Sequence, residues 1–218
     1  MAAARGQIGG AWAWGLMAFL SVGVGLYGLA YLVLGFDAFG EEVRSNGFNQ
    51  MVSPYGLLVH ATAAGLALAL GPFQFVRSLR AKRPKLHRWM GRTYVVACIV
   101  AGVAGGLLAP FTFAGPIAGA GFFLLALAWL WTTVMAYRRA VARDFADHER
   151  WMIRSFSLAL AAVTLRIYLP IAGVTGLPFL ESYIAIAWLA WVPNLIAAEL
   201  YIRARHPARV RADARLAA

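Results

Sequence analysis

His87 and His148 are the residues of this chain with the most direct route to cofactor chemistry. Each stands just ahead of an Arg-Trp-Met sequence and a long apolar run, so the two occupy similar places in the chain. Histidines on facing helices are common ligands of haem b. Both, however, lie in polar turns, where water or a turn carbonyl satisfies an imidazole without any cofactor. The sequence leaves both interpretations open, and no other cofactor is expected.

Arg166 and His60 are polar residues inside apolar runs. An Arg deep in a bilayer is costly unless it finds acceptors, and small neighbours at helical spacing let helices approach closely. We therefore expect both residues to look into a helical bundle, where they bind a small anionic ligand or only pin helices together. The two faces are Ser155, Ala159, Ala162 and Arg166 on one segment, and His60, Ala64, Ala67, Gly71 and Gln74 on the other. The predicted ligand-binding residues are Arg166, His60, Gln74 and Tyr168.

Glu199 is the other charged residue within an apolar run. Arg203 follows one helical turn later, and opposite charges at this spacing pair on the surface of a helix. The sequence therefore predicts an ion pair between Glu199 and Arg203. A proton-relay role, open to any carboxylate in a membrane, is the alternative.

A repeated pattern indicates which elements position these side chains. Residues 88–94, Arg-Trp-Met-Gly-Arg-Thr-Tyr, are echoed by residues 150–156, Arg-Trp-Met-Ile-Arg-Ser-Phe. Each copy leads into an apolar run, which is typical of a helix that enters a bilayer with Arg at the headgroups and Trp at the interface. The repeat predicts two similar hairpins and places Trp89 and Trp151 at the same depth.

The composition predicts an all-α protein of the membrane. Of 218 residues, 61% are hydrophobic and 13% are charged, which is too apolar for a soluble domain. Six segments can cross roughly 30 Å of hydrocarbon at about 1.5 Å per residue. They lie near residues 12–36, 55–76, 93–113, 117–137, 155–173 and 183–202. Because the connections are short, we expect residues 1–218 to form a single integral membrane domain, a six-helix bundle in which spans 2 and 3, and spans 4 and 5, make the two hairpins.

The distribution of charge predicts the orientation. Most of the 20 Lys and Arg residues fall between spans 2 and 3, between spans 4 and 5, and after span 6, whereas the opposite loops carry mainly Asp and Glu. Basic loops face the cytoplasm, so both termini are expected there. In the longest opposite loop, Glu41-Glu42 followed by Asn46-Gly47 predicts a short surface helix and a turn.

The net charge of +11 would suggest a nucleic-acid partner in a soluble protein. Here the charge serves topology, so we expect anionic lipid headgroups rather than nucleic acid at the cytoplasmic face, with Arg80, Lys82, Arg83 and Lys85 as the densest cluster. The single Cys98 excludes an internal disulfide. The first apolar run is too long for a signal peptide and is expected to remain as a span.

Five motifs resemble a known family in their order. They are Gly71-Pro72-Phe73-Gln74-Phe75, His87 to Arg92, His148 to Arg154, Leu165-Arg166-Ile167-Tyr168-Leu169-Pro170, and Trp191-Val192-Pro193-Asn194 with Glu199. Over about residues 59–203 the chain resembles the bacterial membrane proteins grouped as domain of unknown function 2306. The resemblance implies a multi-pass protein of the bacterial inner membrane and assigns no catalytic residue.

The sequence leaves three classes of function open. The favoured one is the binding or transport of a small anionic or lipid-like ligand at a pocket in the non-cytoplasmic half. The alternatives are a membrane oxidoreductase with haem b and a structural or assembly factor. The sequence lacks the nucleophile triads, phosphate-binding glycine loops, metal-ligand clusters and paired carboxylates of hydrolytic or transfer enzymes, so enzymatic activity is not favoured.

Overall fold

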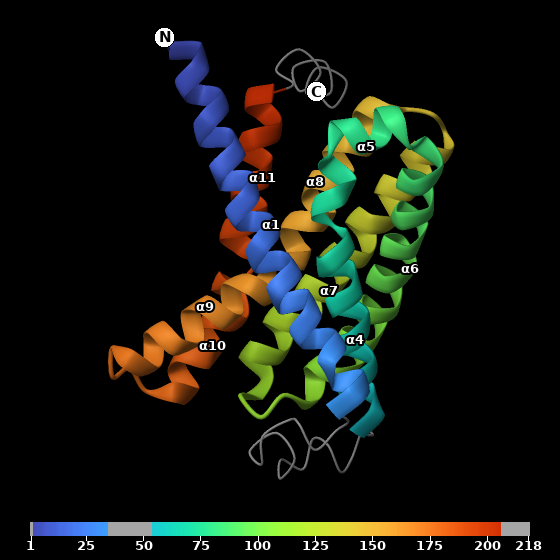
Figure 1. The fold of residues 1–218 in the computed structure, drawn as a ribbon. Coiled ribbons are helices and arrows are strands. Elements are labelled where there is room, and N and C mark those ends of the chain that lie inside the picture. Colours follow the sequence, from blue (N-terminus) through green and yellow to red (C-terminus); the bar gives the residue numbers. More distant parts are fainter. Residues whose placement is uncertain (1, 35–53, 206–218) are drawn as a thin grey trace, which may run out of the picture. The chain divides into compact units, whose positions relative to one another are not determined.

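The computed structural model describes residues 2–34 and 54–205, which are helical apart from turns (Figure 1). Six segments are long and apolar enough to cross a membrane. They are Trp12–Leu34, Tyr55–Phe75, Pro84–Phe111, Gly115–Val141, Phe145–Val174 and Phe179–Arg205. The predicted all-α fold with six candidate spans is confirmed. The helix and turn predicted at Glu41-Glu42 and Asn46-Gly47, and the basic tail after Arg205, lie outside the described residues.

The chain forms two compact units, Met1–Phe113 and Ala114–Ala218. Each unit holds three of the candidate spans and one copy of the repeat. The single domain, the cytoplasmic termini and the equal depth of Trp89 and Trp151 stay predictions.

Unit 1 is built on a close contact between helices α1 (Ala2–Leu34) and α4 (Pro54–Leu70). A Cβ atom added to Gly65 of α4 would lie 2.6 Å from the carbonyl oxygen of Gly25 on α1, and one added to Gly28 would lie 2.6 Å from that of Ala61. Backbones meet this closely only where side chains are absent, which is a common way for membrane helices to associate.

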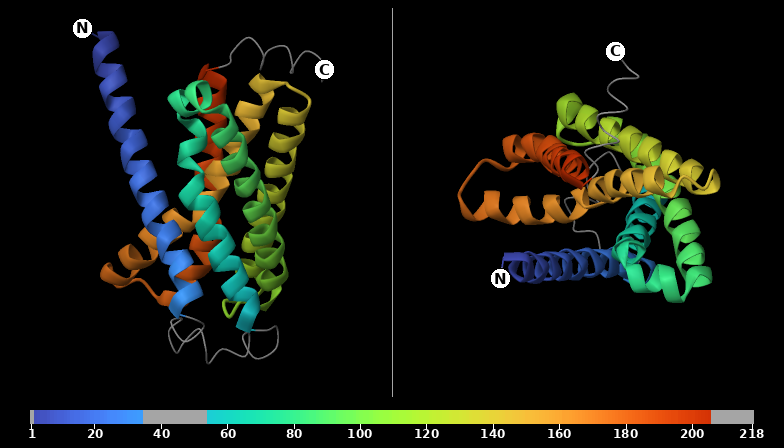
Figure 2. Two further views of the ribbon diagram at one scale, coloured as in Figure 1. Left: turned by 45° about the vertical axis from the view of Figure 1, so that its right-hand side comes forward. Right: turned by 90° about the horizontal axis from the view of Figure 1, so that it is seen from above.

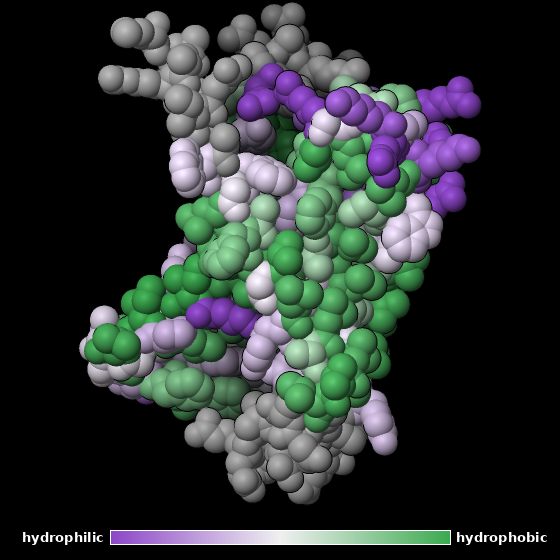
Figure 3. All heavy atoms as spheres, in the orientation of Figure 1, coloured by the Kyte–Doolittle hydropathy of each residue, from purple (hydrophilic) through white to green (hydrophobic). Residues whose placement is uncertain are grey.

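The other helices of unit 1 make the first basic hairpin. After α4 come the short 3-10 helix η2 (Pro72–Phe75), α5 (Arg77–Lys82) and the long α6 (Pro84–Leu108), followed by η3 (Ala109–Phe111). Helix α6 packs against α4, and Pro84 stands in its first turn, where a missing N–H costs nothing. Hydrophilic residues gather over α5 at one end of this unit, and hydrophobic residues follow along α4 below it (Figure 3).

Unit 2 contains one continuous helix and two interrupted ones. Helix α7 (Gly115–Val141) packs against α8 (Phe145–Ala159) and α10 (Phe179–Leu189). The predicted fifth span divides at Leu160 into α8 and α9 (Ala161–Val174), and the sixth divides at Ala190 and Trp191 into α10 and α11 (Val192–Arg205). Helix α9 lies beside α10, and α8 lies beside α11 (Figure 2).

The two interruptions have local causes. Pro193 in the first turn of α11 cannot donate a backbone hydrogen bond, so a new helix begins there. Near Leu160 the hydroxyl of Ser157 donates to the Arg154 carbonyl, and that of Thr164 donates to the Leu160 carbonyl. Such bonds from a side chain to the preceding turn compete with the helical pattern and bend the helix.

Candidate functional site

A groove runs between α4 and α6 in unit 1. It has a volume of about 510 Å³, within the range of about 300–1,000 Å³ typical of small-molecule sites. Helix α4 contributes Ala63 and Leu66. Helix α6 contributes the other lining residues, which are Trp89, Arg92, Thr93, Val96, Ala97 and Val100.

The groove is polar at one end and apolar along the rest of its length. Trp89, Arg92 and Thr93 lie in the part of α6 nearest to α5, whereas the rest of the lining is aliphatic. Trp89 is 63% exposed. The Thr93 hydroxyl donates to the Trp89 carbonyl at 3.1 Å, so its hydrogen bond is made within α6. The Arg92 guanidinium makes no ion pair among the described residues, and it is the only charged group of the lining.

His60 on α4 and Gln74 on η2 both contact α6. His60 Nδ1 lies 2.9 Å from the Ala101 carbonyl oxygen, and a Cβ added to Gly105 would lie 2.8 Å from the ring. Gln74 is buried, and its Oε1 would lie 3.1 Å from a Cβ added to Gly91. The predicted inward orientation of the face of α4 that carries His60 is therefore confirmed, and glycines of α6 make room for both side chains.

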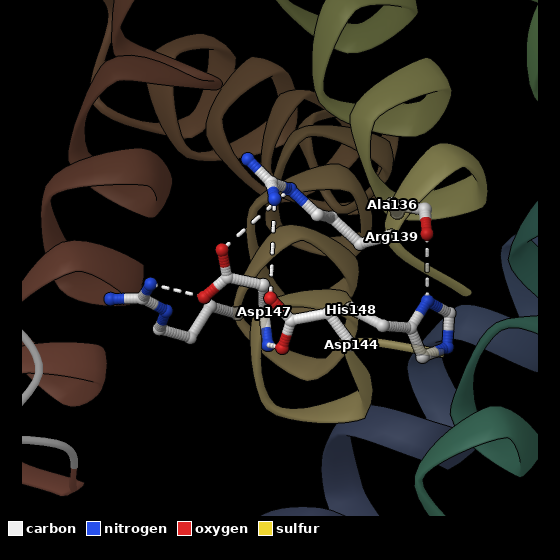
Figure 4. Close-up of polar contacts among 6 residues, drawn as sticks. Ala136, Arg139, Asp144, Asp147 and His148 are labelled. Carbon is white, nitrogen blue, oxygen red and sulfur yellow. Dashed lines mark hydrogen bonds and ion pairs between the residues drawn. The ribbon is translucent and has the colours of Figure 1, made fainter. Parts of the chain in front are cut away.

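The second copy of the repeat, in unit 2, lies within a network of ion pairs (Figure 4). Asp147 accepts from Arg150 and lies 3.6 Å from Nε of Arg139. The Asp144 carboxylate accepts from the Asp147 backbone N–H at 3.2 Å and so caps the start of α8. On the other side of the turn, His148 Nδ1 lies 2.8 Å from the Ala136 carbonyl oxygen. The network joins α7, the turn and α8.

Arg154 and Glu199 connect α8 to α11. The Arg154 guanidinium donates to both carboxylate oxygens of Glu199, with Nη2 to Oε2 at 2.9 Å, and its Cζ lies 4.7 Å from the centre of the Trp151 ring. The predicted pairing of Glu199 with Arg203 is therefore wrong. Arg154 offers two parallel donors across the α8–α11 contact, a better geometry for a carboxylate than one turn along a helix provides.

The two copies of the repeat agree in structure at one aromatic position and differ at an arginine. Tyr94 and Phe156 stand at equivalent positions and are 0% and 3% exposed. The equivalent arginines differ in their surroundings: Arg154 is bound by a carboxylate, whereas Arg92 stands at the groove without one. The same side chain is thus neutralised inside unit 2 and available in unit 1.

Polar bonds also join the helices of unit 2 further along the chain. The hydroxyls of Thr133 on α7 and Ser155 on α8 are 2.7 Å apart and buried. Asn194 on α11 donates to the Thr164 hydroxyl at 2.9 Å and to the Ala190 carbonyl at 3.0 Å. Thr164 and Asn194 thus connect the two interrupted helices directly after their breaks.

Arg166 lies on α9 and is exposed, with Nη1 donating to the Ala162 carbonyl oxygen at 3.0 Å. The prediction that it looks into the bundle is wrong within unit 2. The predicted face assumed one straight helix, whereas the break at Leu160 separates buried Ser155 and Ala159 from Arg166. Because His60 belongs to unit 1, a shared site of Arg166, Tyr168 and His60 stays a prediction.

The two histidines considered as haem ligands lie at the starts of corresponding helices. His87 stands in the first turn of α6 and His148 in the first turn of α8, and both are half-buried. They belong to different units, so their use as a haem pair stays a prediction.

Several contacts of these sites have no signal in the sequence. In the sequence, Trp89 and Arg92 have only the pattern of interface residues, and nothing there indicates a groove beside them. The sequence does contain a signal for Asp144, because an Asp before a helix is a recognised start signal. The partner of Arg154 is remote in the chain, and nothing local to either residue indicates it.

Comparison with known proteins identifies one family. The family described as predicted membrane protein (DUF2306) matches residues 57–202. No curated protein and no solved structure matches the chain. The matched range begins in α4 and ends in α11, so it contains the groove, both copies of the repeat and Glu199.

Proposed function

Because the chain belongs to the DUF2306 family of predicted membrane proteins, we propose a function inside the bilayer: it binds a lipid-like anionic ligand in the groove between α4 and α6. The class of ligand is the one expected from the sequence, but the binding site is a different one. The groove lies at the basic end of unit 1, rather than at Arg166.

The observation that carries this proposal is the uneven lining of the groove. One end holds a guanidinium and an indole, and the remainder is aliphatic. An amphiphile has the same division between a polar head and an apolar chain. Arg and Trp are also the residues that favour the headgroup level of a membrane, where the head of such a ligand resides.

The charges around the groove favour a ligand with an anionic head. Residues 2–34 and 54–113 contain no Asp or Glu. By contrast, α5, the start of α6 and the residue between them carry Arg77, Arg80, Lys82, Arg83, Lys85, Arg88 and Arg92. The positive potential of such a cluster attracts anions from the adjoining leaflet.

Photolabelling tests this function. The protein is placed in nanodiscs of phosphatidylcholine with palmitate that carries a diazirine in its chain, and labelled peptides are identified by mass spectrometry after irradiation. We expect labels on Ala63, Leu66, Val96 and Val100, the apolar part of the lining. Competition by unlabelled amphiphile should remove them, because a bound ligand is displaced whereas bulk lipid contact is not.

A matched pair of variants provides the control. Val100 lines the groove and is 40% exposed, and Val103 on the same helix is 47% exposed but lies outside the lining. Val100→Trp should fill the groove and remove the competable label, and Val103→Trp should leave it unchanged. Equal labelling of both variants, or labels spread evenly over the lipid-facing helices, would refute binding in the groove.

A further inference from the structure

We infer that the ligand of this groove is a long-chain fatty acid, held through its carboxylate by Arg92 in the way that Arg154 holds Glu199. This inference rests on the proposed function and adds the chemistry of the ligand. It follows from a comparison of the two copies of the repeat.

Arg154 shows how the repeat binds a carboxylate. Its guanidinium donates to both oxygens of Glu199 while it lies over the Trp151 ring. A planar guanidinium matches the two oxygens of a carboxylate, which makes the contact both strong and specific. Arg92 and Trp89 stand at the equivalent positions of α6, three residues apart as in α8.

No described residue of unit 1 supplies a carboxylate to complete this arrangement. Its described residues, 2–34 and 54–113, include neither Asp nor Glu. In unit 2 the acid comes from α11, which packs against α8, whereas the neighbour of α6 in unit 1 is α4, which offers Ala63 and Leu66. Among the described residues of unit 1, no carboxylate therefore faces Arg92, and its guanidinium is left to bind the anionic head of a ligand.

The shape of the groove selects a single chain. Beyond Arg92 the lining is aliphatic on both helices, and its volume of about 510 Å³ suits one acyl chain better than two. A carboxylate attached to a single acyl chain is a fatty acid, which enters such a groove laterally from the bilayer.

Competition in the same photolabelling assay tests the headgroup. Unlabelled palmitate should displace the diazirine-bearing palmitate at concentrations at least about tenfold lower than hexadecanol or lysophosphatidylcholine, the scale of one charge-assisted interaction. Arg92→Gln should raise the palmitate concentration required by a similar factor, and Arg92→Lys by less. The comparison is Arg88→Gln, one turn earlier and outside the lining, which weakens only the general positive potential and should raise the required concentration less than Arg92→Gln does.

A second pair of variants tests the analogy with Glu199 directly. Val96 lines the groove one turn beyond Arg92, at a spacing that lets side chains pair on one helix. Val96→Glu should supply an internal carboxylate to Arg92 and exclude palmitate. Val96→Gln, whose side chain has the shape of Glu but no charge, should still bind palmitate.

The possible outcomes distinguish carboxylate binding by Arg92 from ligand binding in the groove. If hexadecanol competes as well as palmitate, or Arg92→Gln binds palmitate normally, the groove takes an acyl chain but not through a carboxylate, and only this inference fails. Stronger competition by lysophosphatidic acid would assign the site to a phosphate and also overturn it. Loss of competable labelling in the unsubstituted protein removes both.

Discussion

Arg154 binds Glu199 across 45 positions of sequence, from the third turn of α8 to the middle of α11. This ion pair joins α8, the first part of the interrupted fifth span, to α11, the second part of the interrupted sixth span. It also provides, within the same chain, an example of how a repeat arginine takes a carboxylate.

The first prediction concerns this pair. Arg154→Gln or Glu199→Gln should lower the free energy of unfolding by about 1 kcal/mol, between the values for exposed ion pairs and for buried hydrogen bonds to charged groups. Thermal unfolding in detergent measures the loss. Arg203→Gln is the matched control, since Arg203 is exposed and makes no ion pair within the part of the chain that the structure describes. A larger effect at Arg203 than at Arg154 would restore the pairing suggested by sequence.

The second prediction concerns the turn between α7 and α8. Arg143 has φ of 59°, and the backbone N–H groups of Arg143 and Asp144 donate to the carbonyls of Ala140 and Arg139, which closes a Schellman motif. A side chain in this left-handed conformation costs about 1 kcal/mol or more. Arg143→Gly should therefore raise the melting temperature, and Arg143→Val should lower it. Gly176, with φ of 70° in the same motif after α9, is the reciprocal case: Gly176→Ala should destabilise.

The third prediction tests the contact of α1 with α4. Gly65→Val should destabilise unit 1 by about 1–3 kcal/mol, because the new side chain meets the Gly25 carbonyl and a packed backbone cannot move aside. Gly23→Val on α1 is the control, since nothing lies within 4 Å of a Cβ at that position. Equal melting temperatures for the two variants would contradict the observed contact.

The fourth prediction applies to the interrupted helices. A double-mutant cycle with Thr164→Val and Asn194→Leu should give a coupling energy of about 0.6 kcal/mol, the average for hydrogen bonds between membrane helices. Both side chains also bond to the carbonyls at the breaks, Leu160 and Ala190, so each single variant should lose more than the coupling alone. Additive effects would show that the two breaks are independent.

The fifth prediction concerns orientation, which rests on charge alone. In a background of Cys98→Ala, a cysteine at Lys82 should react with an impermeant thiol reagent only after the membrane is opened. A cysteine at Asn46 should react in intact spheroplasts. Labelling of the Lys82 position from outside would invert the topology.

The sequence determined the membrane class, the number of spans and the inward face of α4. These properties are set by composition and by helical period, which act over a few turns of one segment. The span boundaries agree with the structure within one turn for the first two spans, Trp12–Leu34 and Tyr55–Phe75. The same reasoning failed for Arg166, because a period continued through Leu160 takes no account of a break.

Only the tertiary structure decided which polar groups meet. Arg92 and Arg154 have the same local sequence, yet Arg154 meets Glu199 because α11 packs on α8, and Arg92 meets a groove because α4 packs on α6. Each packing depends on the side chains of two remote helices, and a single segment carries no record of its neighbour. The repeat therefore determined where the arginines enter the membrane, and helix packing determined that one is neutralised and the other faces an open groove.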